Sequence, residues 1–132
     1  MKPKLWGNQF WFTIHTIALT YPENPSSDEK ESALQFMISL KDLLPCEKCK
    51  LHYKKNINLQ KLKKAIESQE SLFKYTVDLH NMVNTMNGEK ELTIIEAKER
   101  LKNKFIQPSK CGQFWPVIIL TTALLYWIWY KT

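Results

Sequence analysis

Two cysteines separated by two residues carry the most evident chemistry in this sequence. Cys46 and Cys49 lie in the run Leu-Pro-Cys-Glu-Lys-Cys, directly after a proline that fits the beginning of a helix. One sulfur can reach the other through a short loop, so the pair can alternate between a dithiol and a disulfide. Backbone N–H groups at a helix N-terminus also stabilise a thiolate. Three cysteines in 132 residues are too few for a disulfide-stapled scaffold, so the pair indicates redox or metal chemistry.

A second set of residues is suited to binding something flat. Gly7, Trp11 and His15 recur at intervals of four, so on a helix they lie along a single line. The glycine removes a side chain where a planar group could approach, and an indole and an imidazole follow it. The alternative is core packing, which is the usual role of aromatic residues at helical spacing. Spacing alone leaves both interpretations open.

A third set occupies one face of a later helical pattern. Phe73, Val77, His80 and Asn84 share that face, and Asn81 lies beside them. Asparagine is a mediocre helix former, because its side chain competes for backbone hydrogen bonds. Two asparagines and a histidine near the middle of a helix therefore call for a partner. That partner is either another buried polar group of the chain or a polar, planar ligand.

Five helical patterns must position these residues. Capping boxes at residues 26–29 and 93–96 open two of them, and the Asn87-Gly88 pair ends another. No pair of strands is indicated, so the predicted fold class is all-α. The first pattern covers residues 5–20, and the second runs from the first capping box to Leu44. The third is a short segment that carries Cys46, Cys49 and Tyr53. The fourth covers residues 70–86, and the fifth runs from the second capping box through Phe105.

The net charge of +6 comes from lysines that occur along the whole chain. A solvated helix surface is the expected role of these side chains, and attraction to a membrane surface is the alternative. No recognisable nucleic-acid motif accompanies them. The densest group is Lys50, Lys54, Lys55, Lys61, Lys63 and Lys64.

The segment 114–130 has seventeen residues and no charge, which is the short end of what can span a bilayer. Aromatic residues flank it at both ends, as in a membrane-anchoring helix. A buried core helix is the alternative, although a domain of this size could hardly cover it on all sides. Lys102, Lys104 and Lys110 precede the segment and Lys131 follows it, so the positive-inside rule places the rest of the chain on the cytosolic side.

Three motifs follow one another in the order W-G-x-x-x-W-x-x-x-H, L-P-C-x-x-C and H-N-x-V-N. Together they resemble the Erv/Alr family of flavin-dependent sulfhydryl oxidases, most closely the short forms of large cytoplasmic DNA viruses. The resemblance extends from Trp6 to Arg100. It implies a bundle of four helices plus a short fifth, with FAD at the mouth of the bundle and usually a homodimer. The predicted domains are an FAD-binding oxidase domain over residues 1–108, a linker over 109–113 and a transmembrane anchor over 114–130, in a host or virion membrane.

The resemblance also implies a role for each matched residue. Substrate thiols would attack Cys46, Cys49 would lie beside the flavin, and electrons would pass through FAD to O2, giving H2O2. A small dithiol or thioredoxin-like protein is the expected substrate, because the second, shuttle C-x-x-C of many members is absent and only Cys111 remains. The expected cofactor-binding residues are Gly7, Trp11, His15, Tyr53, His80, Asn81, Val83, Asn84 and Lys90.

One position departs from the family pattern, because Lys90 is shifted by one residue from the usual Lys-Pro. Arg100 falls about where a late basic residue contacts the cofactor in relatives. Cys111 has three open roles: an electron relay, a link between two subunits, or an idle thiol.

The alternative function is a non-enzymatic, membrane-anchored helical protein with a structural zinc site. Cys46, Cys49 and His52 would supply three ligands, and Cys111 or His80 the fourth. This interpretation leaves the Trp-Gly and H-N-x-V-N motifs unexplained, and it predicts a colourless protein.

Overall fold

The computed structural model describes residues 2–106, which contain α-helices and one short 3-10 helix and no strand. The predicted all-α class is therefore confirmed for this part of the chain. The predicted anchor at residues 114–130 and Cys111 lie outside the described residues. Between residues 2 and 106, no helix has both the length and the apolar character needed to cross a bilayer. The elements are η1 (Pro3–Leu5), α1 (Gly7–Leu19), α2 (Ser27–Leu43), α3 (Glu47–Asn56), α4 (Leu59–Ala65), α5 (Gln69–Asn87) and α6 (Ile94–Ile106).

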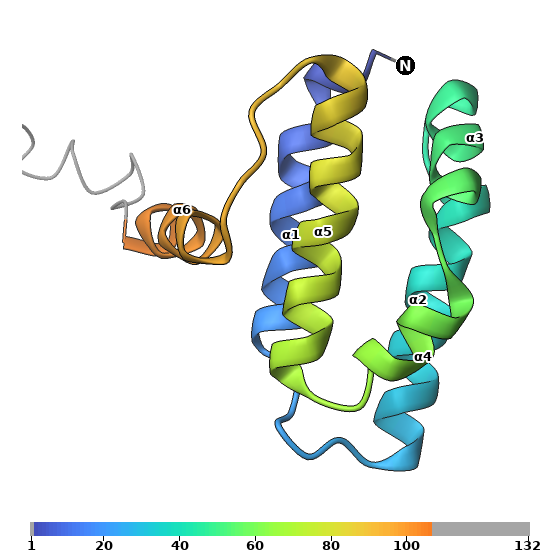
Figure 1. Cartoon of the computed structure of the whole chain (residues 1–132), viewed down its shortest axis with the longest axis vertical. Coiled ribbons are helices and arrows are strands. Elements are labelled where there is room, and N and C mark those ends of the chain that lie inside the picture. Colours follow the sequence, from blue (N-terminus) through green and yellow to red (C-terminus); the bar gives the residue numbers. More distant parts are fainter. Residues whose placement is uncertain (1, 107–132) are drawn as a thin grey trace, which may run out of the picture. The chain divides into compact units, whose positions relative to one another are not determined.

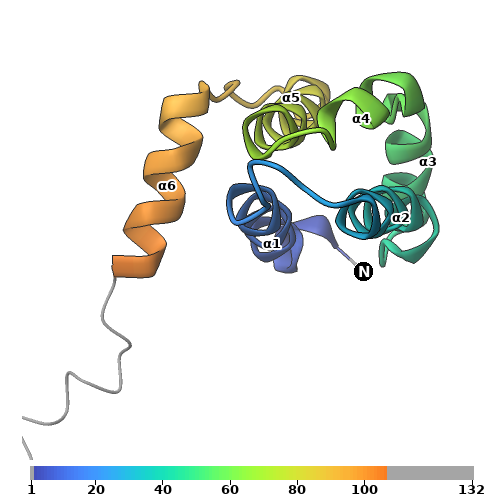
Figure 2. The ribbon, with the colours of Figure 1, turned by 90° about the horizontal axis from the view of Figure 1, so that it is seen from below.

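Residues up to Leu101 form one compact unit. Within it α1 packs along α5, α2 packs along α3, and α4 contacts α5 (Figure 1). Seen along the helix axes, α1, α5, α4, α3 and α2 follow one another around a shared interior (Figure 2). Figure 1 also shows that α1 begins, α5 ends and α3 begins at the same end of this unit. Three segments far apart in the sequence therefore meet at that end.

The interior is filled by one face from each helix. The largest fully buried side chains are those of Phe73, Leu62, Leu72, Val77 and Thr76. Burying a residue such as Phe73 stabilises the fold by roughly 1.5–3 kcal/mol. Thr76 is the exception in this group, because its hydroxyl needs a hydrogen-bond partner in the interior.

The predicted helix ends are confirmed. The Ser26 hydroxyl accepts the Glu29 N–H, and the Glu29 carboxylate accepts the Ser26 N–H at 2.8 Å. Thr93 and Glu96 form the same reciprocal pair at the start of α6. Gly88 closes α5 with a φ of 71°, a left-handed conformation that glycine adopts without strain.

The five predicted patterns miss α4. This helix has seven residues, too few for an amphipathic period to stand out, and three of them are lysines. It forms because the Asn58 side chain accepts the Lys61 N–H at 3.0 Å and because Leu62 and Ala65 are buried. The capping asparagine was the available signal in the sequence.

Candidate functional site

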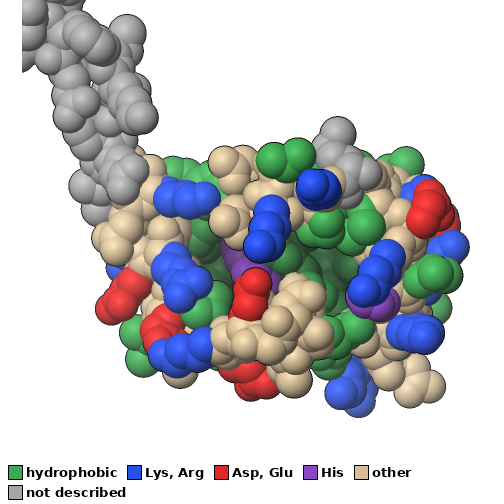
Figure 3. Space-filling model, turned by 90° about the horizontal axis from the view of Figure 1, so that it is seen from above, with side chains coloured by type: hydrophobic (Ala, Val, Ile, Leu, Met, Phe, Trp, Pro, Cys, Tyr) green, Lys and Arg blue, Asp and Glu red, His purple; other side chains and the backbone are tan. Residues whose placement is uncertain are grey.

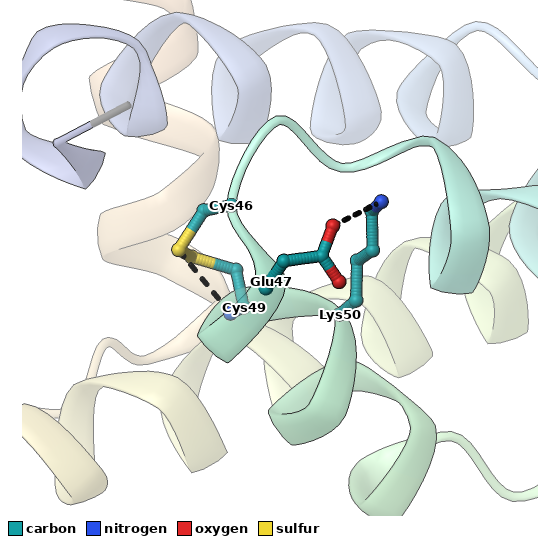
Figure 4. The surroundings of a disulfide bond; sticks show 4 residues. All are labelled: Cys46, Glu47, Cys49 and Lys50. Atoms are coloured by element: carbon teal, nitrogen blue, oxygen red, sulfur yellow. Dashed lines mark hydrogen bonds and ion pairs between the residues drawn. A yellow bond between two sulfur atoms is a disulfide. The ribbon is translucent and has the colours of Figure 1, made fainter.

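The cysteine pair lies at the first turn of α3. Cys46 is the N-cap residue with an extended backbone, and its sulfur accepts the Cys49 N–H at 3.3 Å (Figure 4). A disulfide joins the two residues, whose Cα atoms are 5.1 Å apart. Both side chains are half-buried. The pair is thus held at a helix N-terminus, where backbone N–H groups favour negative charge on sulfur.

Two charged neighbours of the cysteines neutralise one another. Glu47 and Lys50 form an ion pair at 2.7 Å and extend away from the sulfur atoms (Figure 4). The hydrogen bond from Lys50 holds the pKa of Glu47 below its usual value. Lys50 is therefore engaged by a carboxylate, whereas the N-terminus of the helix still provides a positive field at the sulfurs.

Tyr53 fixes α3 against α2. It lies one turn after Cys49, is buried, and donates its hydroxyl to the carbonyl oxygen of Met37 at 2.8 Å. Burial raises the pKa of this hydroxyl. The contact with α2 accounts for the position of Tyr53, and its expected contact with a flavin stays a prediction.

The other predicted faces, on α1 and α5, meet one another. The Trp11 and His80 rings are stacked, with centroids 4.2 Å apart and planes 9° from parallel. His15 packs against both rings, at 5.8 Å from Trp11 and 5.2 Å from His80. We call these three side chains the ring stack. The two motifs that flank the cysteines in the sequence therefore build a single feature of the structure.

Hydrogen bonds around the ring stack determine which histidine nitrogens carry protons. The Thr76 hydroxyl donates to the Phe73 carbonyl at 2.8 Å, so toward Nδ1 of His15, at 3.0 Å, it can only accept. His15 Nδ1 consequently carries the proton and His15 Nε2 is an acceptor. Nδ1 of His80, 2.9 Å from His15 Nε2, must then be the donor. Within residues 2–106 the Nε2 atom of His80 has no hydrogen-bond partner and keeps its lone pair.

Both histidines are neutral at pH 7. Burial lowers the pKa of His15 to about 4. The pKa of His80 is also lowered to about 4, first by burial and then by electrostatic interactions with His15 and Arg100. Neutral rings agree with the hydrogen-bond directions, because a proton on His15 Nε2 would face the N–H of His80.

The two asparagines bind backbone of the connection between α5 and α6. The Asn81 side chain donates to the Leu92 carbonyl and accepts the Leu92 N–H, both at 2.8 Å. Asn84 is buried and donates to the Lys90 carbonyl at 3.3 Å. Of the two partners left open by the sequence, the structure provides the internal one. The amide of Asn81 retains one further donor hydrogen.

The other predicted cofactor contacts have different surroundings. A Cβ atom built on Gly7 would meet nothing within 4 Å, so space is open there. Val83 is half-buried. Lys90 is exposed and forms an ion pair with Glu96 at 2.8 Å. Arg100, by contrast, lies close enough to His80 to lower the pKa of that imidazole.

The cysteine pair lies at the end of the unit where α1 begins and α5 ends, and α1 and α5 are the helices that build the ring stack. Figure 3 looks onto this end and shows a recess lined by hydrophobic side chains, with a histidine inside it. Within the described residues, no three His, Cys, Asp or Glu side chains are grouped so that they could hold a metal ion. The described part of the chain thus offers a disulfide, stacked rings and an unpaired acceptor, but no zinc ligand set.

Comparison with known proteins assigns the arrangement to a family. The sequence profile of the Erv1/Alr family matches residues 8–105. The chain belongs to the Erv1/Alr family. A probable FAD-linked sulfhydryl oxidase of Acanthamoeba polyphaga mimivirus, R368, is 37% identical over 116 residues, covering 87% of this chain and 81% of its own. A putative FAD-linked sulfhydryl oxidase of Invertebrate iridescent virus 3, 096R, is 33% identical over 105 residues, covering 80% and 71%.

Solved structures of the Erv1/Alr family share the fold. The yeast Erv1 core superposes with a TM-score of 0.69 at 24% identity, covering 77% of this chain and 85% of that one. The FAD-binding domain of Erv1 from Saccharomyces cerevisiae gives a TM-score of 0.68, covering 78% and 96%. The predicted resemblance, including the likeness to viral proteins, is confirmed by these comparisons.

Sequence reasoning missed one residue of the site in this Erv1/Alr protein. Thr76 orients His15, and through it His80, yet it reads as an ordinary threonine within a helix. A hint was its place on the buried face of α5, one residue before Val77, where a hydroxyl needs a partner. The identity of that partner depends on which residue of α1 lies opposite.

Proposed function

We propose that this chain is an FAD-dependent thiol oxidase that forms disulfide bonds in other proteins. One observation carries the proposal: the Cys46–Cys49 disulfide begins α3 at the end of the unit where α1 begins and α5 ends, and these two helices build the ring stack of Trp11, His15 and His80. Support comes from relatives that are named FAD-linked sulfhydryl oxidases and match most of the chain.

The residues present suit a flavin nucleotide. Aromatic rings offer stacking surfaces, the open space at Gly7 admits a planar group, and His80 Nε2 accepts a hydrogen bond. Arg100 near His80 supplies a positive charge for phosphate oxygens, whereas Lys90 is engaged by Glu96. The residues that would hold FAD are Gly7, Trp11, His15, His80, Asn81, Val83 and Asn84, with Arg100 as the cation. When bound, FAD accepts the electron pair of the Cys46–Cys49 dithiol and passes it to O2, giving H2O2.

The protein's own chemistry is thiol–disulfide exchange. A substrate thiolate attacks the sulfur of Cys46, the S–S bond breaks, and Cys49 leaves as a thiolate. The second substrate thiolate then attacks the substrate sulfur of this mixed disulfide and releases Cys46. The substrate gains one disulfide, and the cysteine pair takes up the two electrons as a dithiol. The Cys49 N–H, 3.3 Å from the Cys46 sulfur, stabilises the charge on Cys46 as it leaves.

Cys46 is the better placed sulfur for attack by a protein substrate. It lies in the extended segment before α3, while Cys49 lies within the helix and packs against the core. This asymmetry supports the order in which Cys46 receives the substrate and Cys49 faces the cofactor.

Absorbance and oxygen uptake of the purified full chain test the proposal. The protein should be yellow with one FAD per chain, and dithiothreitol should drive oxygen consumption with one H2O2 formed per disulfide. Cys46→Ser and Cys49→Ser should each lose turnover and keep FAD. A folded, colourless protein that contains zinc would contradict the proposal and support the structural alternative.

We also propose, from the sequence, that residues 1–108 are the oxidase domain and that residues 114–130 anchor it to a membrane with the domain in the cytosol. Support comes from the uncharged, aromatic-flanked segment and from the lysines before it. A homodimer and a small dithiol protein as substrate complete the proposal. Membrane fractionation of the full chain and of a chain ending at residue 108 tests the anchor, and sedimentation tests the dimer.

A further inference from the structure

The positive charge of this protein is concentrated in the segment that begins at its disulfide. Residues 46–66 contain seven lysines and a single acid, Glu47. The rest of the chain contains twelve basic and twelve acidic residues, so its formal charge is zero. Outside this segment the charges cancel only in total: residues 98–132 carry six basic residues and one acid, whereas residues 23–45 and 67–97 carry more acids than lysines. The segment 46–66, which we call the α3–α4 hairpin, has a formal charge of +6 and is the most basic stretch of the chain.

Most lysines of the hairpin are not offset by neighbouring acids. Lys50 pairs with Glu47 at 2.7 Å, and Lys54 pairs with Asp42 of α2 at 3.1 Å. The other five are exposed and form no ion pair with any residue between 2 and 106. These five are Lys48, Lys55, Lys61, Lys63 and Lys64.

The hairpin begins at the reactive sulfurs. Cys46 is its first residue. From there α3 extends away from the disulfide, and α4 follows it in the sequence. Figure 3 shows lysine side chains around the right-hand side of the face that holds the recess, over α3. The Debye length is about 8–10 Å at physiological salt, so the nearest lysines act directly on whatever approaches Cys46.

We propose that the α3–α4 hairpin steers acidic dithiol proteins to the Cys46–Cys49 disulfide. The inference rests on the proposed thiol oxidase function, which it deepens by giving the substrate a charge. A field of one sign beside a reacting group raises the association rate of oppositely charged partners by tenfold or more at low salt. Because a disulfide is reduced by thiols, a protein that is steered to this place reacts there if it contains a dithiol.

Nucleic acid is a poorer match for the hairpin. Its single aromatic residue, Tyr53, is buried and cannot stack on a base. Its cations are all lysines, without the arginines that contact phosphate in two places at once. The exposed apolar side chains between the lysines are Leu51 and Leu59, which suit a protein surface.

The test uses the full chain with FAD and three substrates: dithiothreitol, and two peptides with the same Cys-x-x-Cys flanked either by glutamates or by lysines. The glutamate peptide should have the higher kcat/KM, by about tenfold at low salt, and the difference should shrink at high salt. Lys48→Gln with Lys55→Gln, which removes the two unpaired lysines of α3, should lower kcat/KM for the glutamate peptide by about threefold to fivefold. The control, Lys30→Gln with Lys74→Gln, removes two lysines near the other end of the unit and should change this rate little.

Dithiothreitol separates the two proposals. If the wild-type protein does not oxidise it, the proposed function fails. If dithiothreitol is oxidised equally by all variants but the two peptides react alike, the steering proposal is wrong and the oxidase function stands. Equal effects of the hairpin and control variants on the glutamate peptide would also overturn it. The steering proposal would also be wrong if the hairpin variant kept the wild-type preference between the two peptides but no longer bound a DNA oligonucleotide or phosphatidylserine vesicles. That result would assign the lysines to nucleic acid or to a membrane.

Discussion

Nε2 of His15 lies 2.9 Å from Nδ1 of His80, so two imidazoles that are 65 positions apart in the sequence share one hydrogen bond. Thr76 holds the other side of His15 at 3.0 Å. The chain of bonds has one consistent direction, from His80 through His15 and Thr76 to the Phe73 carbonyl. Burial lowers the pKa of both histidines, and the outer one presents a lone pair.

Thr76→Val should break the chain of hydrogen bonds at His15 while preserving the shape of the side chain. The Nδ1–H of His15 would lose its acceptor in a buried place, which costs about 1–3 kcal/mol of unfolding free energy. Urea unfolding gives the cost, and the 15N shifts of the ring nitrogens give the tautomer. Thr76→Ser keeps the hydroxyl and should keep the Nδ1–H form. A fixed Nδ1–H tautomer of His15 in Thr76→Val would contradict the assigned direction.

The stability of the cofactor-free protein should fall as the pH drops from 6.5 to 4. The pKa of each histidine is lowered from its usual 6.5 to about 4 in the folded state, so the unfolded chain takes up protons first. Stability is then full above pH 6.5 and is lost as the pH approaches 4. The loss for buried His15 is on the order of 2–3 kcal/mol, and less for the more exposed His80.

Chemical unfolding at several pH values measures this loss. Carboxylates with lowered pKa, such as that of Glu96, add a loss of their own at the acid end of the range. His15→Gln removes the titrating ring. The slope of unfolding free energy against pH in the wild-type protein, minus the slope in this variant, therefore gives the contribution of His15. An identical slope in His15→Gln would show that His15 titrates normally.

Cys46 should stabilise α3 even when no disulfide is present. Its sulfur caps the helix by accepting the Cys49 N–H. Cys46→Ser keeps an N-cap acceptor and Cys46→Ala does not, so the alanine variant should be less stable by about 1 kcal/mol. Both variants lack the disulfide, which makes each the control of the other. Equal midpoints of urea unfolding would mean that the contact at 3.3 Å contributes nothing to the helix.

Gly7→Ala and Gly88→Ala should have opposite effects. An alanine side chain at position 7 meets nothing in the protein, so stability should be kept or rise slightly, whereas FAD affinity should fall. Gly88 has a φ of 71°, so alanine there should cost about 1 kcal/mol of stability and leave FAD affinity unchanged. Fluorescence titration with FAD and thermal unfolding measure the pair. Unchanged FAD affinity in Gly7→Ala would mean that FAD does not occupy the open space beside Gly7.

Local patterns in the sequence predicted what depends on near neighbours. The capping boxes at Ser26 and Thr93 and the glycine end of α5 are three such features, because each is complete within four residues. The intervals of Gly7, Trp11 and His15 likewise predicted a shared helix face, and the ring stack uses two of its members.

The rest depends on how distant segments lie against one another. The partner of Thr76 is decided by the packing of α1 on α5, and no local period reports it. Asn81 bonds to Leu92 because the chain turns back after Gly88. The ion pair between Lys90 and Glu96 also forms where the chain turns back after Gly88. Because Lys90 is paired in this way, Arg100 is the cation that acts on His80.

Tyr53 anchors the helix that carries Cys49 but not the segment that carries Cys46. Its buried hydroxyl, bonded to Met37, ties α3 to α2 and carries Cys49 with it. Cys46 instead sits in the extended residues between the two helices, where rotation about its own backbone disturbs no helical hydrogen bond of α3 beyond the first turn. We therefore expect that, when the S–S bond opens, Cys46 changes position and Cys49 does not. Reduction of the pair would then change the outer surface of the protein and leave its interior as it is.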